Sequence, residues 1–119
     1  MPSFTSARIS IPAVSLTFIS SATFPSTSNF ERAFVREGGL LVAGLDPTGN
    51  GGIVAGFGDL RGVELLVEEG FTPMEAIKIA SLNGARFLGE DARIGSIAVG
   101  KQADLMVVKG NPAANIGDI

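Results

Sequence analysis

The feature that most restricts the fold of this chain is the segment LLVAGL, residues 40–45, an unbroken apolar run that ends on Asp46. The run lacks alternation of apolar and polar residues, which is typical of a strand covered on both faces in a parallel sheet flanked by helices. Ligands of α/β sheets and barrels bind at the carboxyl ends of such strands. Asp46 and the loop PTGNGG are therefore candidates for a functional site, although Asp-Pro is also a common way to begin a turn. The residues alone support both interpretations equally.

Amphipathic helices are predicted on either side of this strand. The segment FERAFVREG gathers its apolar residues on one side and is stopped by Gly38–Gly39. After the glycine-rich stretch GFGDLRG, which we interpret as a loop because its glycine spacing differs from the dinucleotide-binding pattern, a second helix ends at Gly70. Asp59 is a candidate cap for its first turn. Its expected apolar stripe comprises Leu60, Val63, Leu66 and Val67.

A third helix has a stronger start signal. Thr72 is a candidate N-cap, Pro73 occupies the first helical position, and Glu75 completes a capping box. The helix is expected to end at Gly89. Its predicted buried face comprises Ile77, Ala80, Gly84 and Leu88.

The end of the chain changes to short β-prone segments, IGSIAVG and ADLMVVKG, which predict a hairpin that turns at residues 100–102. The stretch GSIAVGKQ also matches the beginning of a phosphate-binding loop. A working loop of that kind needs Ser or Thr after the lysine and then a helix, whereas Gln102 and a strand-like segment follow here. A hairpin turn is therefore the favoured interpretation.

Composition excludes several classes of site and partner. The net charge is −3 at pH 7 and the isoelectric point is about 4.8, which gives no basic surface for nucleic acid or anionic lipid. The chain has no Cys and no His, so disulfides, thiolate sites and histidine ligands are absent, and any zinc site would have only carboxylates. No apolar run approaches the roughly 20 residues that span a bilayer.

The amino-acid composition changes near residue 29. Residues 1–29 are rich in Ser and Thr and contain one charged side chain, Arg8. We interpret them as a leader of unclear origin, followed by a unit of strand and helices over residues 30–92 and a β-hairpin with a tail over 93–119. A secretory signal within residues 1–24 is the weaker alternative, because Pro12 and many hydroxyls interrupt its apolar part, so a cytoplasmic location is slightly favoured.

Three segments together resemble the carboxyl-terminal third of metal-dependent amidohydrolases, in the branch that includes imidazolonepropionase-like and prolidase-like enzymes. They are VAGLDPTGNGG, GFTPMEAIKIASLNGARFLG and RIGSIAVGKQADLMVVKGNPAANI, which occur in a consistent order within residues 30–119. The resemblance implies an α/β fold. In this fold the chain would supply the last strand and helices of a (β/α)8 barrel of the TIM type, and a C-terminal hairpin of a β-sandwich built from both chain ends.

The resemblance also implies a chemistry. In the family, an aspartate at the end of the last barrel strand touches a divalent metal, with zinc favoured, and moves protons between the attacking water and the leaving nitrogen. Asp46 matches this aspartate as both the catalytic and the metal-binding residue, whereas Leu45 replaces the usual threonine. The loop residues Thr48, Gly49, Asn50, Gly51 and Gly52 are candidates for contacts with a small amide substrate. The family's histidine ligands and its bridging lysine or glutamate have no counterpart in this chain, so we expect the isolated chain to retain no metal.

The leading hypothesis is that this chain is the C-terminal part of an amidohydrolase that cleaves amide or other C–N bonds, either non-peptide or dipeptide-like. Its partner would be the remainder of the barrel, and the chain alone would be inactive. The alternatives are a non-catalytic interaction module that self-associates through exposed barrel edges, and a truncated remnant. Substrate identity stays open among cyclic amides, dipeptides and N-acylated amino acids, because only one of the specificity-setting loops is present.

Overall fold

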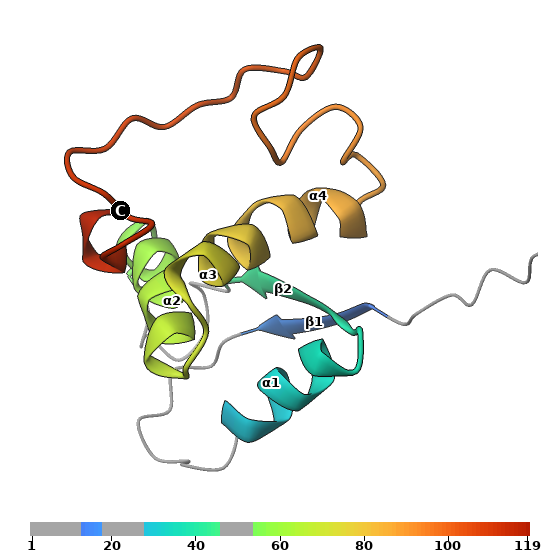
Figure 1. Ribbon diagram of the computed structural model, residues 1–119, viewed down its shortest axis with the longest axis vertical. Helices are drawn as coiled ribbons and strands as arrows, with labels where there is room; N and C mark the ends of the chain where they lie inside the picture. Colours follow the sequence, from blue (N-terminus) through green and yellow to red (C-terminus); the bar gives the residue numbers. More distant parts are fainter. Residues whose placement is uncertain (1–12, 18–27, 46–53) are drawn as a thin grey trace, which may run out of the picture.

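The computed structural model describes residues 13–17, 28–45 and 54–119 (Figure 1). In chain order the elements are β1 (Ala13–Thr17), α1 (Ser28–Arg36), β2 (Leu40–Gly44), α2 (Phe57–Glu68), α3 (Pro73–Ala80), α4 (Leu82–Phe87) and a 3-10 turn, η1 (Ile116–Asp118). The predicted order of helix, strand, helix and helix is therefore present, and a further strand precedes it.

The two strands form a parallel pair joined by α1. The register runs from Ala13 opposite Leu40 to Thr17 opposite Gly44, so both strands end at the same edge of the sheet. Parallel strands need a crossover connection, and α1 lies within it. The strand β1 falls within residues 1–29, which we interpreted as a leader of unclear origin. The predicted domain boundaries at residues 29 and 92 stay predictions.

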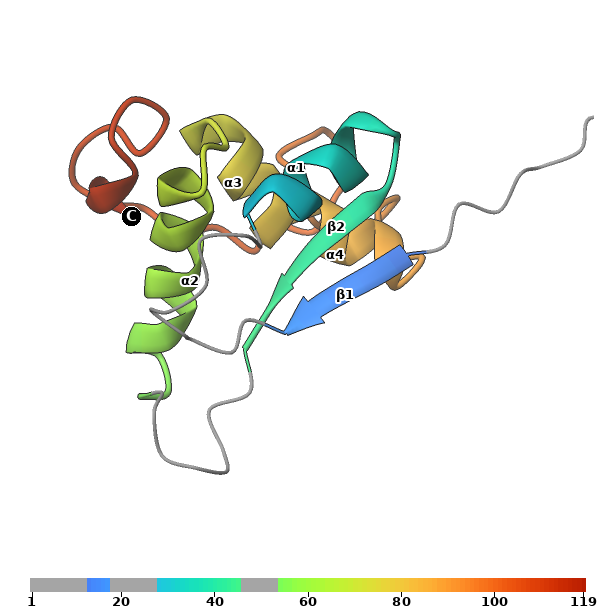
Figure 2. The same cartoon turned by 90° about the horizontal axis from the view of Figure 1, so that it is seen from below.

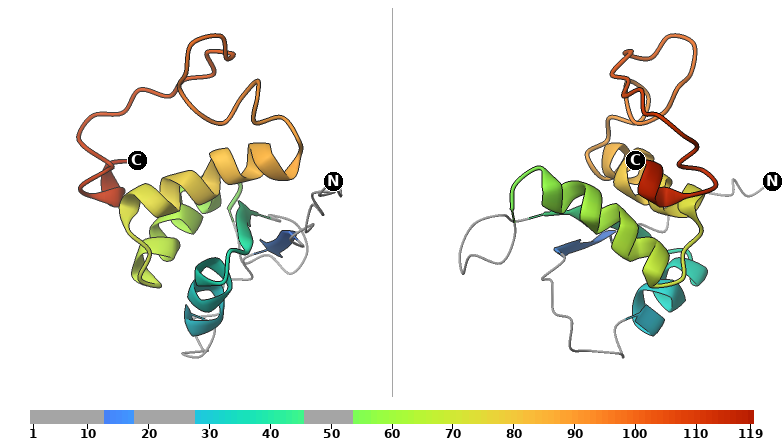
Figure 3. Two further views of the ribbon diagram at one scale, coloured as in Figure 1. Left: turned by 45° about the vertical axis from the view of Figure 1, so that its right-hand side comes forward. Right: turned by 90° about the vertical axis from the view of Figure 1, so that its left-hand side faces the viewer.

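Helices flank β2 on both sides, which confirms the interpretation of its apolar run. In Figures 1 and 3, α1 lies on one side of β2 and the pair α3 and α4 on the other. Figure 2, a view from below, shows α1 next to β2 and the strands β1 and β2 running side by side. Leu41 and Val42 point to opposite faces of the strand and are 0% and 8% exposed, so both faces are covered. Leu41 belongs to a core formed with Val63, Leu66, Phe71, Ala76, Ile79 and Ile116.

The start of α3 forms as predicted. The Thr72 hydroxyl accepts a hydrogen bond from the Glu75 backbone N–H at 3.3 Å, and the Glu75 carboxylate accepts one from the Thr72 N–H at 2.8 Å. This reciprocal pair is the capping box, and Pro73 stands at the first helical position.

The start of α2 differs from the prediction. The helix begins at Phe57, so the glycine-rich stretch expected as a loop is mostly helical, and Gly56 stands at the N-cap with a φ of 82°. Asp59 lies inside the first turn and makes no capping hydrogen bond. The cap prediction was wrong because the N-cap is Gly56, three residues before Asp59, which leaves Asp59 past the position where its oxygen could reach the free N–H groups.

The third predicted helix is divided at Ser81, whose φ and ψ are −130° and −80°. Its buried residues are Ala76, Ile79, Asn83 and Ala85, whereas Ala80 and Leu88 of the predicted face are exposed. The break at Ser81 interrupts the single helical period on which the predicted face was based, and Asn83 lies buried against β2 after it. Among the described helices, none has the length and apolarity to cross a bilayer.

The hairpin predicted near the end of the chain is not formed in the described structure. Residues 98–101 make a turn, in which the Lys101 N–H donates to the Ala98 carbonyl at 3.2 Å, but no strand occurs in residues 93–119. A two-stranded hairpin is marginal unless a third strand or a helix covers its apolar face. Here Ile97 and Val107 are 89% and 95% exposed, so no described residue supplies that cover.

Candidate functional site

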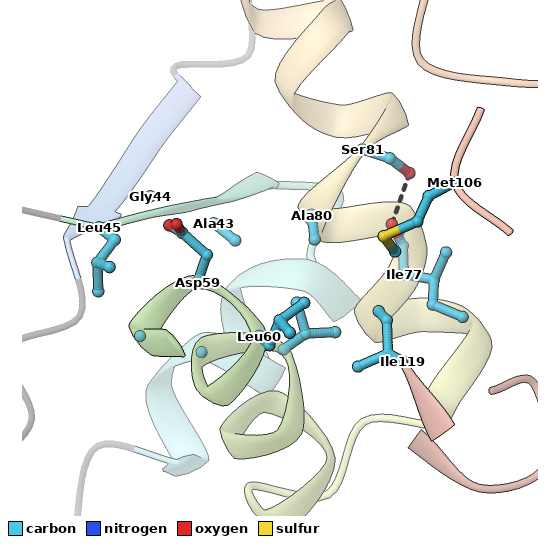
Figure 4. Close-up of a pocket in the computed structure, with 13 residues that line it drawn as sticks. Ala43, Gly44, Leu45, Asp59, Leu60, Ile77, Ala80, Ser81, Met106 and Ile119 are labelled. Carbon is cyan, nitrogen blue, oxygen red and sulfur yellow. Dashed lines mark hydrogen bonds between the residues drawn. The ribbon is translucent and has the colours of Figure 1, made fainter. Parts of the chain in front are cut away.

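A cavity of about 330 Å³ lies at the carboxyl end of β2, between this strand and the helices α2 and α3. Its wall on the strand side is formed by residues 43–45, and Met106 and Ile119 from the end of the chain complete it (Figure 4). The lining is mostly apolar, as in typical small-molecule sites, which combine an apolar wall with a few polar groups. The location agrees with the edge of the sheet at which the sequence predicted a site.

Two polar side chains line this cavity, and they differ in how they are engaged. The Ser81 hydroxyl donates its proton to the Ile77 carbonyl at 2.6 Å, a hydrogen bond to the preceding helical turn. Asp59 carries the only charged side chain among the described residues of the lining. Figure 4 shows its carboxylate directed from α2 toward Ala43 and Gly44 at the end of the strand. The cavity therefore presents one negatively charged side chain within an apolar wall.

The strand that borders the cavity is held by a buried amide that the sequence did not single out. The Asn83 side chain, 8% exposed, donates from Nδ2 to the Leu41 backbone carbonyl at 2.8 Å. This bond ties α4 to β2 across 42 positions of the chain. A polar residue inside an otherwise apolar helix face was the available signal, but its partner could not be identified without the fold.

The residues predicted to form the catalytic and substrate-contacting site, Asp46, Thr48, Gly49, Asn50, Gly51 and Gly52, lie outside the described residues. Their roles stay predictions. The structure does describe Leu45, which borders the cavity and is followed directly by Asp46 in the sequence. The site is thus bounded on the strand side by the residue that precedes the predicted aspartate.

The described residues do not fit a metal centre. They contain no group of three or more Asp, Glu, His or Cys side chains close enough to hold an ion. The whole sequence lacks His and Cys, the usual zinc ligands. Within the described lining, Asp59 contributes the only carboxylate side chain, and one carboxylate does not make a complete site for a divalent ion.

The lysine of the GSIAVGKQ stretch is engaged within its own loop. The Lys101 ammonium donates to the Asp91 carbonyl at 2.5 Å and to the Ser96 hydroxyl at 2.6 Å. The Gln102 N–H donates to the Arg93 carbonyl at 2.9 Å, which closes the loop at its base. In this arrangement the lysine stabilises a turn, and no helix follows to receive a phosphate.

Comparison with known proteins adds the identity of the family. The sequence profile of the Amidohydrolase family matches residues 14–119, which is most of the chain. The chain belongs to the amidohydrolase family. The match begins within β1, earlier than the resemblance seen in the sequence, and members of this family generally bind a divalent metal.

Individual relatives match over shorter regions. A 5'-deoxyadenosine deaminase of Methanobrevibacter smithii is 41% identical over 59 residues, which cover 50% of this chain and 14% of that protein. An imidazolonepropionase of Syntrophobacter fumaroxidans is 42% identical over 45 residues, covering 38% of this chain and 11% of that protein. A putative N-acetylgalactosamine-6-phosphate deacetylase of Escherichia coli is 34% identical over 92 residues, covering 69% of this chain and 55% of that protein.

The chain thus spans less than two thirds of the length of each of these relatives. At the level of the family, the deaminase and the deacetylase support hydrolysis of carbon–nitrogen bonds.

Proposed function

We propose that this chain is the C-terminal part of an amidohydrolase that hydrolyses an amide or other C–N bond of a small molecule. The observation that carries the proposal is the match of residues 14–119 to the family. A parallel β-α-β unit followed by α2 and α3 is the arrangement expected for the final portion of a barrel, and the cavity at the carboxyl end of β2 lies at the edge where such folds bind ligands.

Asp46 is the residue proposed to act in the reaction. It follows Leu45, which borders the cavity. A carboxylate at this position accepts a proton from the attacking water as the water oxygen bonds to the substrate carbon. It then delivers that proton to the nitrogen as the C–N bond breaks. Both transfers require the carboxylate to lie within hydrogen-bonding reach of the reacting atoms.

The remainder of the site must come from outside this chain. Because the described residues do not assemble a metal site and the sequence lacks His and Cys, we expect the purified chain to retain no zinc and to show no hydrolase activity. Metal analysis and turnover measurements on the chain test this directly. Stoichiometric zinc together with turnover would show that the chain is a complete enzyme.

The role of Asp46 is tested in a chimaera in which residues 40–119 replace the equivalent C-terminal segment of the Methanobrevibacter smithii deaminase. Deamination of 5'-deoxyadenosine is the readout. Asp46→Asn removes the proton acceptor and keeps the size of the side chain, so we expect a loss of about a hundredfold or more in kcat. Asp91→Asn is the matched control, because that side chain is exposed and lies in a turn after α4.

Circular dichroism and gel filtration must show that each chimaera is folded. A folded Asp46→Asn chimaera that keeps its activity would contradict the assigned role. A folded chimaera without turnover when Asp46 is intact would contradict the proposal that this segment supplies a working aspartate.

A further inference from the structure

The cavity at the carboxyl end of β2 has the size and the lining of a small-molecule site. Its volume of about 330 Å³ lies near the lower end of the range for such sites, about 300–1,000 Å³. Leu60 and Met106 line it and are 40% and 67% exposed. An apolar molecule in the cavity would remove part of this surface from water, which favours binding.

The two polar side chains of the described lining are both available as hydrogen-bond acceptors. Asp59 is exposed, and its carboxylate has no ion-pair partner among the described residues. Arg61, the only cation of α2, donates instead to Glu64 and Glu68. The Ser81 hydroxyl donates its proton to a backbone carbonyl of α3, so its oxygen is left as an acceptor. A ligand group that donates hydrogen bonds and carries a positive charge therefore suits this lining.

We propose that the cavity binds a small apolar molecule that carries a protonated amine, with Asp59 as the counter-ion. An ammonium group offers three donors and no acceptor. The Asp59 carboxylate points from α2 toward the end of β2, next to the apolar wall (Figure 4), so the amine reaches it while the apolar part contacts the wall. The start of a helix favours an anion, but Asp59 already supplies negative charge in the first turn of α2, and a ligand anion would be repelled by it.

The charge is expected to contribute modestly, because Asp59 is exposed. The amine should bind about threefold to fivefold more tightly than a neutral molecule of the same shape. Salt screens exposed charges, so this preference should shrink as the ionic strength rises. The inference gives a ligand class to the cavity invoked in the proposed function, but it rests on binding alone.

The test is a titration of the isotope-labelled chain, followed by amide chemical shifts, with probes that share one apolar ring. The probes are cyclohexylmethylammonium, cyclohexylmethanol and cyclohexanecarboxylate. We expect a dissociation constant on the order of 1 mM for the amine, weaker binding of the alcohol and the weakest binding of the carboxylate. The shifts should concentrate at the cavity lining on α2 and α3. Raising the salt from about 20 mM to about 500 mM should bring the affinity for the amine close to that for the alcohol.

Variants separate the charge from the cavity. Asp59→Asn should make the amine and the alcohol bind equally, whereas Asp91→Asn, the same change outside the lining, should keep the preference. Gly62 lines the cavity, and a Cβ added there meets no atom within 4 Å. Gly62→Leu should therefore occupy the cavity and weaken binding of the amine and the alcohol by about tenfold or more, whereas Gly62→Ala should change it little. Both substitutions favour the helix relative to glycine.

Several results would overturn the proposal. They are no saturable binding of the amine up to about 20 mM, or an equal or higher affinity for the alcohol or the carboxylate. A preference for the amine that persists in folded Asp59→Asn, or binding that Gly62→Leu leaves unchanged, has the same consequence. The spectra show whether each variant is folded, and the salt series on the wild type tests the charge without any substitution. None of these results bears on Asp46, whose role the chimaera tests.

Discussion

The hydrogen bond from Asn83 to Leu41 offers a sharp test of how the helices hold β2. Asn83→Asp keeps the size and shape of the side chain but replaces the donating amide with an oxygen that faces the Leu41 carbonyl, now 2.8 Å from Nδ2. The site is 8% exposed, so water cannot readily take over the lost partner. The substitution should therefore destabilise the chain at neutral pH.

The size of the effect follows from two contributions. Loss of the hydrogen bond removes about 1 kcal/mol. Burial of a carboxylate next to a carbonyl oxygen adds about 2 kcal/mol or more, which gives a total of about 3 kcal/mol at pH 7. Burial also raises the pKa of the introduced carboxyl above its ordinary value, because the charged form is disfavoured. In the folded variant the protonated acid can donate to Leu41, so the deficit should shrink as the pH falls through that raised pKa.

Urea unfolding followed by far-UV circular dichroism is the suitable assay, since the chain contains no Trp or Tyr for fluorescence. Asn83→Ala loses the bond without adding a charge, so its deficit should depend little on pH. Asn111→Asp makes the same chemical change at an exposed position beside the Asp118 carboxylate, so we expect a smaller cost, on the order of 0.5 kcal/mol, from repulsion between two exposed carboxylates. A deficit for Asn83→Asp below about 1 kcal/mol at pH 7, or one that does not depend on pH, would refute the reasoning.

Three further predictions concern the core, a helix start and a loop. Leu66 is 0% exposed, so Leu66→Ala should lower the free energy of unfolding by about 3 kcal/mol in urea titrations. Thr72→Ala should cost about 1 kcal/mol. The Thr72 N–H and hydroxyl lower the pKa of Glu75. The stabilisation by the capping box is therefore present at neutral pH and is lost as the pH falls through the lowered pKa of Glu75. Comparison of the free energies of unfolding of the variant and the wild type across pH tests this. Gly95→Ala should reduce the melting temperature more than Gly100→Ala. Both glycines have a positive φ, but only at Gly95 would the new methyl group come within 2.5 Å of a side chain on α4.

The parts of the fold that sequence patterns predicted are those set by local chemistry. The capping box of Thr72 and Glu75 involves neighbouring residues, so its spacing sufficed. The covered strand at residues 40–44 followed from an apolar run that suits few other environments. The stop of α1 after Arg36 is likewise a local requirement, because Gly38, whose φ is 87°, adopts the left-handed conformation that follows the helix.

The parts that could not be predicted depend on partners distant in the sequence. The orientation of α4 is set by Asn83 and its bond to β2, which no periodicity reveals. The strand β1 pairs with β2 across the crossover through α1, and the type of residue in 13–17 does not identify this distant partner. The β-prone segments near residues 97 and 107 have strand propensity but lack a partner, and propensity alone does not form a sheet. The sequence predicted a site at the carboxyl end of β2, where the cavity lies. The positions of Asn83 behind this cavity and of Asp59 beside it could be found only from the structure.

The last residues of the chain are held by core packing and hydrogen bonds, whereas residues 103–108, which lead to them, are not. Ile116 is buried against the core, and the Asp118 carboxylate accepts from the Asn111 N–H at 2.8 Å and from the Asn115 amide at 3.0 Å. Residues 103–108 contribute no comparable attachment. A protease added to the folded chain should therefore make its earliest cut within residues 103–108, among the described residues, and such a cut would release the fastened end as a short peptide.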